Sequence, residues 1–201
     1  MATLEYFFDY VSPWSYVAHH AMKGVVARTG ATVSVRPMFL GGVMQATGNR
    51  PPGMVAAKAK YMGADLARAC KRYGITMHMN PNFPMNTRGL TRATLGLMDD
   101  LATRDRFIEA VFRLCWNDPR GIDPADPSQL GPALAEAGFD PEQILALATD
   151  DANKAALRAN TDEAVERGAF GAPTFFVGDE MFFGHDRLDY VEEALMALAE
   201  A

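Results

Sequence analysis

The sequence predicts an α/β fold in which the two ends of the chain build one sheet and the middle forms an inserted all-helical domain. An aromatic-rich, strand-like segment opens the chain, a hairpin-like segment lies near its end, and the long stretch between them has alanine- and leucine-rich helical spacing. We therefore place the sheet domain at residues 1–42 and 168–201 and the helical insertion at residues 43–167.

The composition limits the possible functions. Of 201 residues, 49% are hydrophobic and 22% are charged, which is typical of a globular protein. The net charge of -6, without a basic cluster, argues against nucleic acid as a partner. The chain begins without a signal-like segment and has no apolar run of about 20 residues. We expect a cytoplasmic protein without a membrane partner.

The cysteines and histidines indicate neither a disulfide nor a metal site. Cys70 and Cys115 are far apart and lie in helix-like patterns, where buried reduced thiols are expected. The four histidines are scattered, without the spacing of zinc ligands. The sequence therefore implies no metal.

The first elements form a predicted strand-helix-strand unit. Residues 4–10 are read as a buried strand. Ser12 is a suitable N-cap and Pro13 suits the first position of a helix that runs to about residue 29. Gly30 ends this helix, and residues 32–37 alternate as in a second strand.

The last elements form a predicted hairpin and helix. Residues 173–177 and 180–183 resemble two strands joined by a two-residue turn, and a helix follows over residues 187–199. Pro173 stands at the entrance of the first of these strands, where either a cis bond or an ordinary trans bond is possible.

The main candidate site is Ser-Pro-Trp-Ser at residues 12–15. Its two hydroxyls, on Ser12 and Ser15, lie three residues apart at a strand-to-helix junction, so both can face one site. A helix N-terminus favours an anion such as a thiolate in front of it. The alternative is that Ser12 only caps the helix.

Three motifs together carry a family resemblance: Ser-Pro-x-Ser at residues 12–15, Gly-Ala-Pro-Thr at residues 171–174 and Phe-Gly-x-Asp-Arg at residues 183–187. In this order, around a helical insertion, they resemble the kappa-class glutathione transferase family of the DsbA-like thioredoxin superfamily, especially its 2-hydroxychromene-2-carboxylate isomerase branch. The resemblance implies a thioredoxin-like fold and glutathione as the cofactor.

The resemblance also implies roles for the motif residues. DsbA-type oxidoreductases carry Cys-x-x-Cys where this chain has Ser12 and Ser15, so dithiol exchange is excluded. Ser12 is expected to donate a hydrogen bond to the glutathione sulfur. Pro173 is expected to be cis, and the Ala172 backbone to pair with the cysteinyl part of glutathione.

Further contacts are implied at the outer end of glutathione and at the second substrate. Asp186 is expected to meet the ammonium group, with backbone contacts at His185, and Asn49 is expected to touch the tripeptide. Asn86 and Arg88 are expected to bind a substrate carboxylate. Each of these residues has a plainer alternative: a helix N-cap for Asp186, and turn or surface positions for Asn49, Asn86 and Arg88.

The implied activity is a glutathione-dependent cis-trans isomerase in aromatic hydrocarbon catabolism. It interconverts 2-hydroxychromene-2-carboxylate and trans-o-hydroxybenzylidenepyruvate, so its substrate is a small aromatic carboxylate, and a homodimer is expected. Two alternatives stay open: a kappa-type glutathione transferase or peroxidase, and a glutathione-binding module without catalysis.

Overall fold

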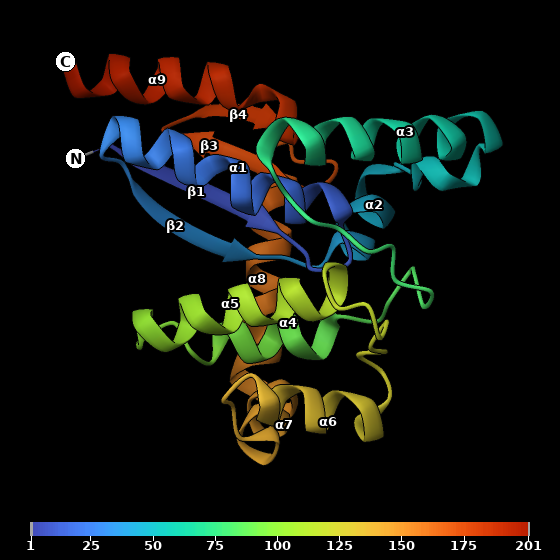
Figure 1. The fold of residues 1–201 in the computed structure, drawn as a ribbon. Helices are drawn as coiled ribbons and strands as arrows, with labels where there is room; N and C mark the ends of the chain where they lie inside the picture. The colour runs from blue at the N-terminus through green and yellow to red at the C-terminus, as the bar shows by residue number, and fades with distance from the viewer. Residues whose placement is uncertain (1, 201) are drawn as a thin grey trace.

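The structure is a computed structural model that describes residues 2–200, and it confirms the predicted α/β class (Figure 1). Both chain ends contribute strands to one sheet, and the middle of the chain is helical. The elements are β1 (Thr3–Phe8), α1 (Pro13–Thr29), β2 (Thr32–Pro37), α2 (Leu40–Thr47), the 3-10 helix η1 (Pro52–Met54), α3 (Ala56–Tyr73), α4 (Arg88–Leu95), α5 (Leu101–Trp116), α6 (Pro127–Glu136), α7 (Pro141–Thr149), α8 (Asp151–Glu166), β3 (Thr174–Val177), β4 (Glu180–Phe183), the 3-10 helix η2 (His185–Arg187) and α9 (Leu188–Glu200).

The sheet has the strand order β2-β1-β3-β4 over the described residues. β1 runs parallel to β2, and β3 is antiparallel to both β1 and β4. The predicted strand-helix-strand unit and hairpin are therefore confirmed. β1 ends at Phe8 rather than at residue 10, because the Ser12 backbone N–H donates to the Asp9 carbonyl and turns the chain into α1.

The two faces of the sheet are covered by different helices. Leu4, Tyr6 and Phe8 are fully buried in a core shared with α1 and α9, whereas Phe7 and Phe176 are buried with α2 and α8. This alternation follows from the two-residue period of a strand. Burial of each aromatic side chain stabilises the fold by about 1.5–3 kcal/mol.

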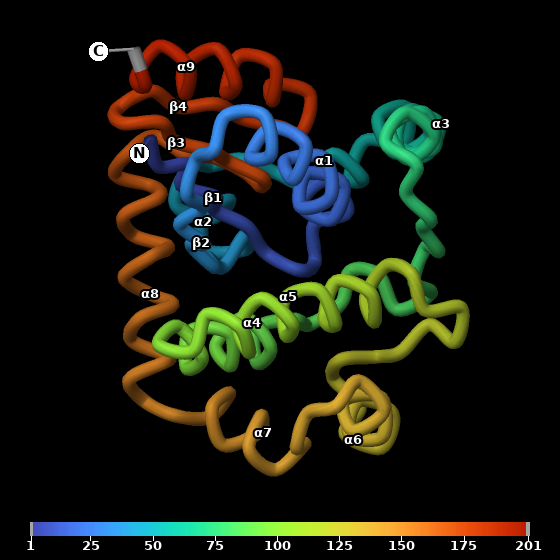
Figure 2. The backbone as a smooth tube through the Cα atoms, turned by 60° about the vertical axis from the view of Figure 1, so that its left-hand side comes forward, coloured from blue at the N-terminus to red at the C-terminus, as the bar shows by residue number. Residues whose placement is uncertain are grey.

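The helical middle of the chain returns to the sheet through α8. Figure 2 shows α8 running from the end of α7 back to the strands, and Ala164 of α8 packs with Val43 of α2 against the sheet core. The first and last helices of the predicted insertion thus cover the sheet directly. The division into residues 1–42 with 168–201 and residues 43–167 stays a prediction.

The helices between residues 2 and 200 include no candidate for a membrane-spanning segment. None of the helices described there combines the length and the apolar character that a bilayer-spanning segment needs.

Candidate active site

The turn between β1 and α1 is organised around the Ser12 side chain. Its Oγ accepts a hydrogen bond from the Ser15 backbone N–H at 3.1 Å, so the predicted N-cap is confirmed. The same Oγ donates to the Ala172 carbonyl oxygen at 3.1 Å, across 160 residues of sequence. The structure therefore brings Ser12 and Ala172 together, as a shared site requires.

The segment before β3 forms the other side of this contact. The Ala172–Pro173 bond is cis, as predicted. The Gly184 backbone N–H donates to the Pro173 carbonyl at 3.0 Å, which ties this segment to the residue before η2. The Ser12 turn, the Pro173 segment and the start of η2 therefore meet in one region.

The expectation that both hydroxyls of the junction face one site stays a prediction for Ser15, because the structure shows a hydrogen bond to Ala172 from Ser12 alone among the described residues. Ser15 is fully buried, and its Oγ has no hydrogen-bond partner among the residues that the structure describes. Its carbonyl accepts a hydrogen bond from the Tyr6 hydroxyl at 2.7 Å. The Tyr6–Ser15 bond therefore fixes the first turn of α1 to β1.

Asp9 is a structurally important residue that the sequence analysis misses. The carboxylate is 2% exposed and accepts hydrogen bonds from the backbone N–H groups of Val11 and Leu40 and from the Thr87 hydroxyl, at 3.2, 2.9 and 2.7 Å. Burial raises the pKa of Asp9, while these donors and the nearby charge of Arg88 oppose the rise. The signal in the sequence is an acid directly after the aromatic residues Phe7 and Phe8 of the strand-like run. Asp9 links the Ser12 turn to α2 and to the start of α4.

Asn49 lies beside the Pro173 segment. Its Nδ2 donates to the Phe170 carbonyl at 2.7 Å, and its Oδ1 accepts from the Arg50 backbone N–H at 2.8 Å. Asn49 is exposed, so part of its surface stays accessible. Asn49, the predicted contact to the outer end of glutathione, thus bonds to Phe170, which lies two positions before Ala172.

Asp186 and His185 lie in η2, at the start of the last helix. Asp186 is exposed and pairs with Arg187 at 3.0 Å. Within the described residues its carboxylate caps no backbone N–H, so the plain N-cap alternative is not supported. The imidazole of His185 stacks on the indole of Trp14, with ring centroids 4.5 Å apart and planes at 8°.

Asn86 and Arg88 flank Thr87 at the start of α4, and both are exposed. The Arg88 guanidinium lies over the Phe39 ring, 4.1 Å from its centroid. The Asn86 Oδ1 accepts a long hydrogen bond of 3.4 Å from the Arg88 backbone N–H. The Thr87–Asp9 hydrogen bond fixes this segment to the end of β1, and no hydrogen bond joins either side chain to Ser12 among the described residues.

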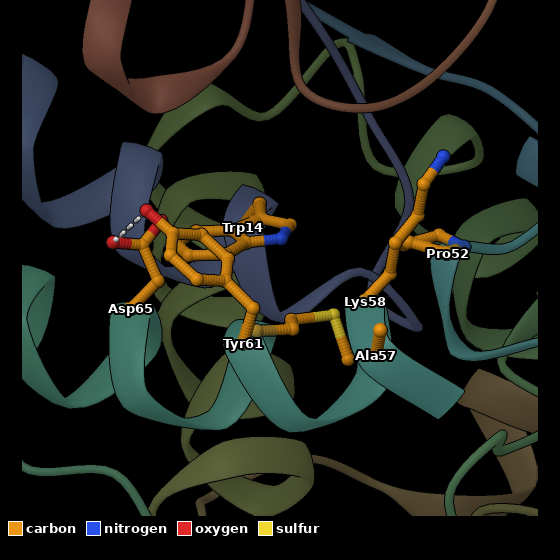
Figure 3. Close-up of a pocket in the computed structure, with 7 residues that line it drawn as sticks. Trp14, Pro52, Ala57, Lys58, Tyr61 and Asp65 are labelled. Atoms are coloured by element: carbon orange, nitrogen blue, oxygen red, sulfur yellow. Dashed lines mark hydrogen bonds between the residues drawn. The ribbon is translucent and has the colours of Figure 1, made fainter. Parts of the chain in front are cut away.

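A pocket of about 370 Å³ opens between the start of α1 and α3 (Figure 3). In Figure 3, Trp14 and Tyr61 lie together on one side of it and Lys58 with Pro52 on the other. Its walls are mostly apolar, with one cation and one carboxylate. Sequence reasoning did not find this pocket, whose lining residues are Trp14, Pro52, Ala57, Lys58, Tyr61, Met62 and Asp65.

The two cysteines lie in α3 and α5. Both are free, as predicted. Cys115 is buried, and burial raises the pKa of its thiol far above the ordinary value. Cys70 is partly buried, and burial raises the pKa of its thiol by a smaller amount. Neither thiol is activated as a nucleophile. Residues 2–200 contain no cluster of three or more metal-ligating side chains placed to hold an ion.

The family is decided by a match over nearly the whole chain. A model of the DSBA-like thioredoxin domain matches residues 3–196. The chain belongs to this family. Its fold is that of the solved structure of 2-hydroxychromene-2-carboxylate isomerase, with a TM-score of 0.85 and 28% identity over 98% of this chain and 96% of the other.

Two groups of curated relatives are similar to this DSBA-like chain. The 2-hydroxychromene-2-carboxylate isomerase of Sphingobium xenophagum is 31% identical over 196 residues, covering 96% of this chain and 98% of the relative. Glutathione S-transferase kappa 1 of Caenorhabditis elegans is 30% identical over 205 residues, covering 96% and 90%. The resemblance derived from the three motifs is thus confirmed.

Proposed function

We propose that this protein is a glutathione-dependent isomerase that interconverts 2-hydroxychromene-2-carboxylate and trans-o-hydroxybenzylidenepyruvate. The observation that carries the proposal is the Ser12–Ala172 contact at the N-terminus of α1. A DsbA-like enzyme with serine at this position lacks its own nucleophile there, but it keeps the helix terminus that stabilises a thiolate. Similarity to the curated isomerases supports the same substrate.

Glutathione would bind with its sulfur in front of the α1 N-terminus. The Ser15 backbone N–H holds the Ser12 oxygen in place, so the single hydroxyl proton can turn from the Ala172 carbonyl to the sulfur. The cysteinyl N–H of glutathione would then replace Ser12 as the donor to Ala172, in a short β-like pairing beside Pro173. This exchange leaves no buried carbonyl without a donor.

The rest of the tripeptide would extend toward η2 and the loop after α2. Asp186 offers a carboxylate to the ammonium group and the His185 backbone lies beside it, while Asn49 approaches from the loop tied to Phe170. An ammonium–carboxylate pair is a charge-assisted contact, which is among the stronger polar interactions.

The reaction then uses glutathione as a borrowed nucleophile. The thiol releases its proton to solvent, and the thiolate adds to the electrophilic double bond of the ring-opened substrate. A carbon–sulfur bond forms, and the electron pair of the double bond moves onto the adjacent ketone as an enolate. The former double bond, now single, rotates. The enolate electron pair then restores the double bond in the trans geometry and expels the thiolate, which takes up a proton from solvent, so glutathione is released unchanged. Ser12 stabilises the thiolate and forms no covalent bond.

The aromatic substrate would occupy the pocket between α1 and α3. Trp14 and Tyr61 offer aromatic walls, and Lys58 offers a cation for a carboxylate. Asn86 and Arg88 are the contacts proposed from the sequence for that carboxylate. Their place at the start of α4, anchored through Thr87 to Asp9, keeps them at the same end of the sheet as Ser12. We also propose a cytoplasmic homodimer acting in aromatic catabolism.

A kappa-type transferase is the second candidate, supported by the relative from Caenorhabditis elegans. It differs only in the last step, because conjugation results when elimination does not follow addition. The deciding experiment measures 2-hydroxychromene-2-carboxylate turnover by dialysed protein with and without glutathione. We expect turnover only with glutathione and no net consumption of it. Loss of free thiol with an aromatic conjugate as product would favour the transferase.

A further inference from the structure

The imidazole of His185, in η2, packs on Trp14, a residue that lines the pocket. It lies flat on the Trp14 indole, at 4.5 Å and 8°, and the Tyr73 ring meets it edge-on at 6.4 Å and 81°. Trp14 also lines the pocket between α1 and α3 (Figure 3). One indole therefore contacts both His185 and the space that a ligand would occupy.

Trp14 packs against the cluster of Val17, Leu66 and Ala69, and His185 covers the face of its ring. Trp14 is the second residue of α1, two residues after Ser12, and it is only half-buried. Side chains in the first turn of a helix have few neighbours on the same helix, so their rotamers are fixed by contacts from other elements. His185 from η2 supplies such a contact, and an offset stack of two flat rings favours one orientation of the indole.

The charges around His185 decide whether this stack is neutral. Burial lowers the pKa of His185, and the nearby charge of Arg72 adds to this, while the carboxylates of Asp186 and Asp65 oppose it. The imidazole is therefore neutral at neutral pH and becomes a cation on acidification. The charged or titratable groups facing it are Asp186 and Arg187 of η2, Asp65, Arg72 and Tyr73 of α3, and Asp189 of α9, which pairs with Arg72.

We propose that His185 is a positioning residue, whose ring holds the Trp14 indole as a wall of the pocket and thereby sets the affinity for the aromatic part of the second substrate. The inference rests on the proposed function, which places that substrate in the pocket between α1 and α3. It assigns the His185 side chain to the aromatic substrate and leaves only its backbone for glutathione.

The first test is spectroscopic and needs no activity. The chain has two tryptophans, and Trp116 is fully buried against Phe83. A protonated imidazole stacked on an indole quenches its fluorescence. We expect the wild-type emission to fall on acidification with a midpoint below 6.5, and this titration to vanish in His185→Phe and in Trp14→Phe. A wild-type emission that does not titrate, or one that titrates equally in both variants, would overturn the proposal.

The second test separates the two ligands kinetically. His185→Ser should raise KM for the aromatic substrate about two- to tenfold, equivalent to about 0.4–1.4 kcal/mol, and more than it raises KM for glutathione. His185→Phe, which keeps a flat ring, should restore the aromatic KM. His78→Ser is the matched control, because His78 is exposed and does not line the pocket.

Two outcomes separate this inference from the proposed function. A His185→Ser protein that loses glutathione affinity, without rescue by His185→Phe, would show that the side chain serves glutathione and would refute the positioning role. If the wild type fails to isomerise hydroxychromene carboxylate, equilibrium binding of 2-naphthoate replaces KM. Weaker binding in His185→Ser with rescue in His185→Phe would still support the inference, and equal binding in all three proteins would reject it.

Discussion

Replacing Ser12 by alanine removes a hydroxyl with two roles in the structure. Its oxygen accepts the Ser15 backbone N–H, and its proton is donated to the Ala172 carbonyl. Loss of the N-cap should lower the free energy of unfolding by about 0.5–2 kcal/mol. Loss of the donor should raise the pKa of bound glutathione, because a hydrogen bond to a charged acceptor contributes about 1.5–3 kcal/mol.

The effect on turnover follows from that second loss. If thiolate formation limits the rate, about 1.5–3 kcal/mol corresponds to a roughly ten- to hundredfold fall at neutral pH. Affinity for the tripeptide should change little, because Asp186, Asn49 and the Ala172 backbone are proposed to hold the remainder. Raising the pH should restore part of the rate, since more glutathione ionises without help.

The assay is a pH series of turnover, with glutathione affinity measured separately for the wild type, Ser12→Ala and Ser15→Ala. Ser15→Ala is the matched control, because the Ser15 hydroxyl is buried and has no hydrogen-bond partner among the described residues. It should keep full turnover and lose no stability. Full activity of Ser12→Ala at neutral pH, or an equal loss at every pH, would refute thiolate stabilisation by Ser12.

Three further predictions follow from single contacts. Thr87→Val leaves the buried Asp9 carboxylate one donor short and should lower the free energy of unfolding in urea by about 1.5–3 kcal/mol, more than Thr91→Val, whose hydroxyl bonds only within its own helix. Asp186→Asn should weaken glutathione binding about tenfold in calorimetry at unchanged kcat; unchanged affinity would remove Asp186 from the site. The hydrogen bond from His19, with a smaller contribution from Lys23, lowers the pKa of Glu109. The ionised Glu109 carboxylate therefore stabilises the folded protein above the ordinary glutamate pKa, and this stabilisation is lost as the pH falls below that pKa. Glu109→Gln should therefore lose less stability than the wild type between about pH 5 and pH 3, and equal losses would contradict the ion pair.

The elements near the chain ends could be predicted because their signals are local. The Ser12 cap with Pro13 behind it starts α1 at the predicted place, and Gly30, with φ 67°, ends it in the left-handed conformation that glycine favours. The hairpin turn at residues 178–179 is predicted for a similar reason, since Gly178 has φ 60°. Each of these features depends on residues only a few positions apart.

The features that were missed depend on residues far apart in sequence. The Asp9–Thr87 bond joins residues 78 positions apart, and no local pattern pairs them. The stack of His185 on Trp14 is also invisible to periodicity, as is the pocket between α1 and α3. Spacing alone also does not show that the Ser15 hydroxyl is buried without a hydrogen-bond partner among the described residues.

Under the proposed function, the contact between Ser12 and Ala172 would couple glutathione binding to thiol activation. Ser12 has one hydroxyl proton, and it is donated to the Ala172 carbonyl in the structure. It can serve a thiolate only if another donor reaches that buried carbonyl, since leaving the carbonyl unpaired costs about 1–3 kcal/mol. The cysteinyl N–H of the tripeptide is such a donor, whereas a simple thiol without an amide has none to offer. If the proposed function is right, the Ser12–Ala172 hydrogen bond should therefore make the protein selective for a thiol carried on a peptide backbone.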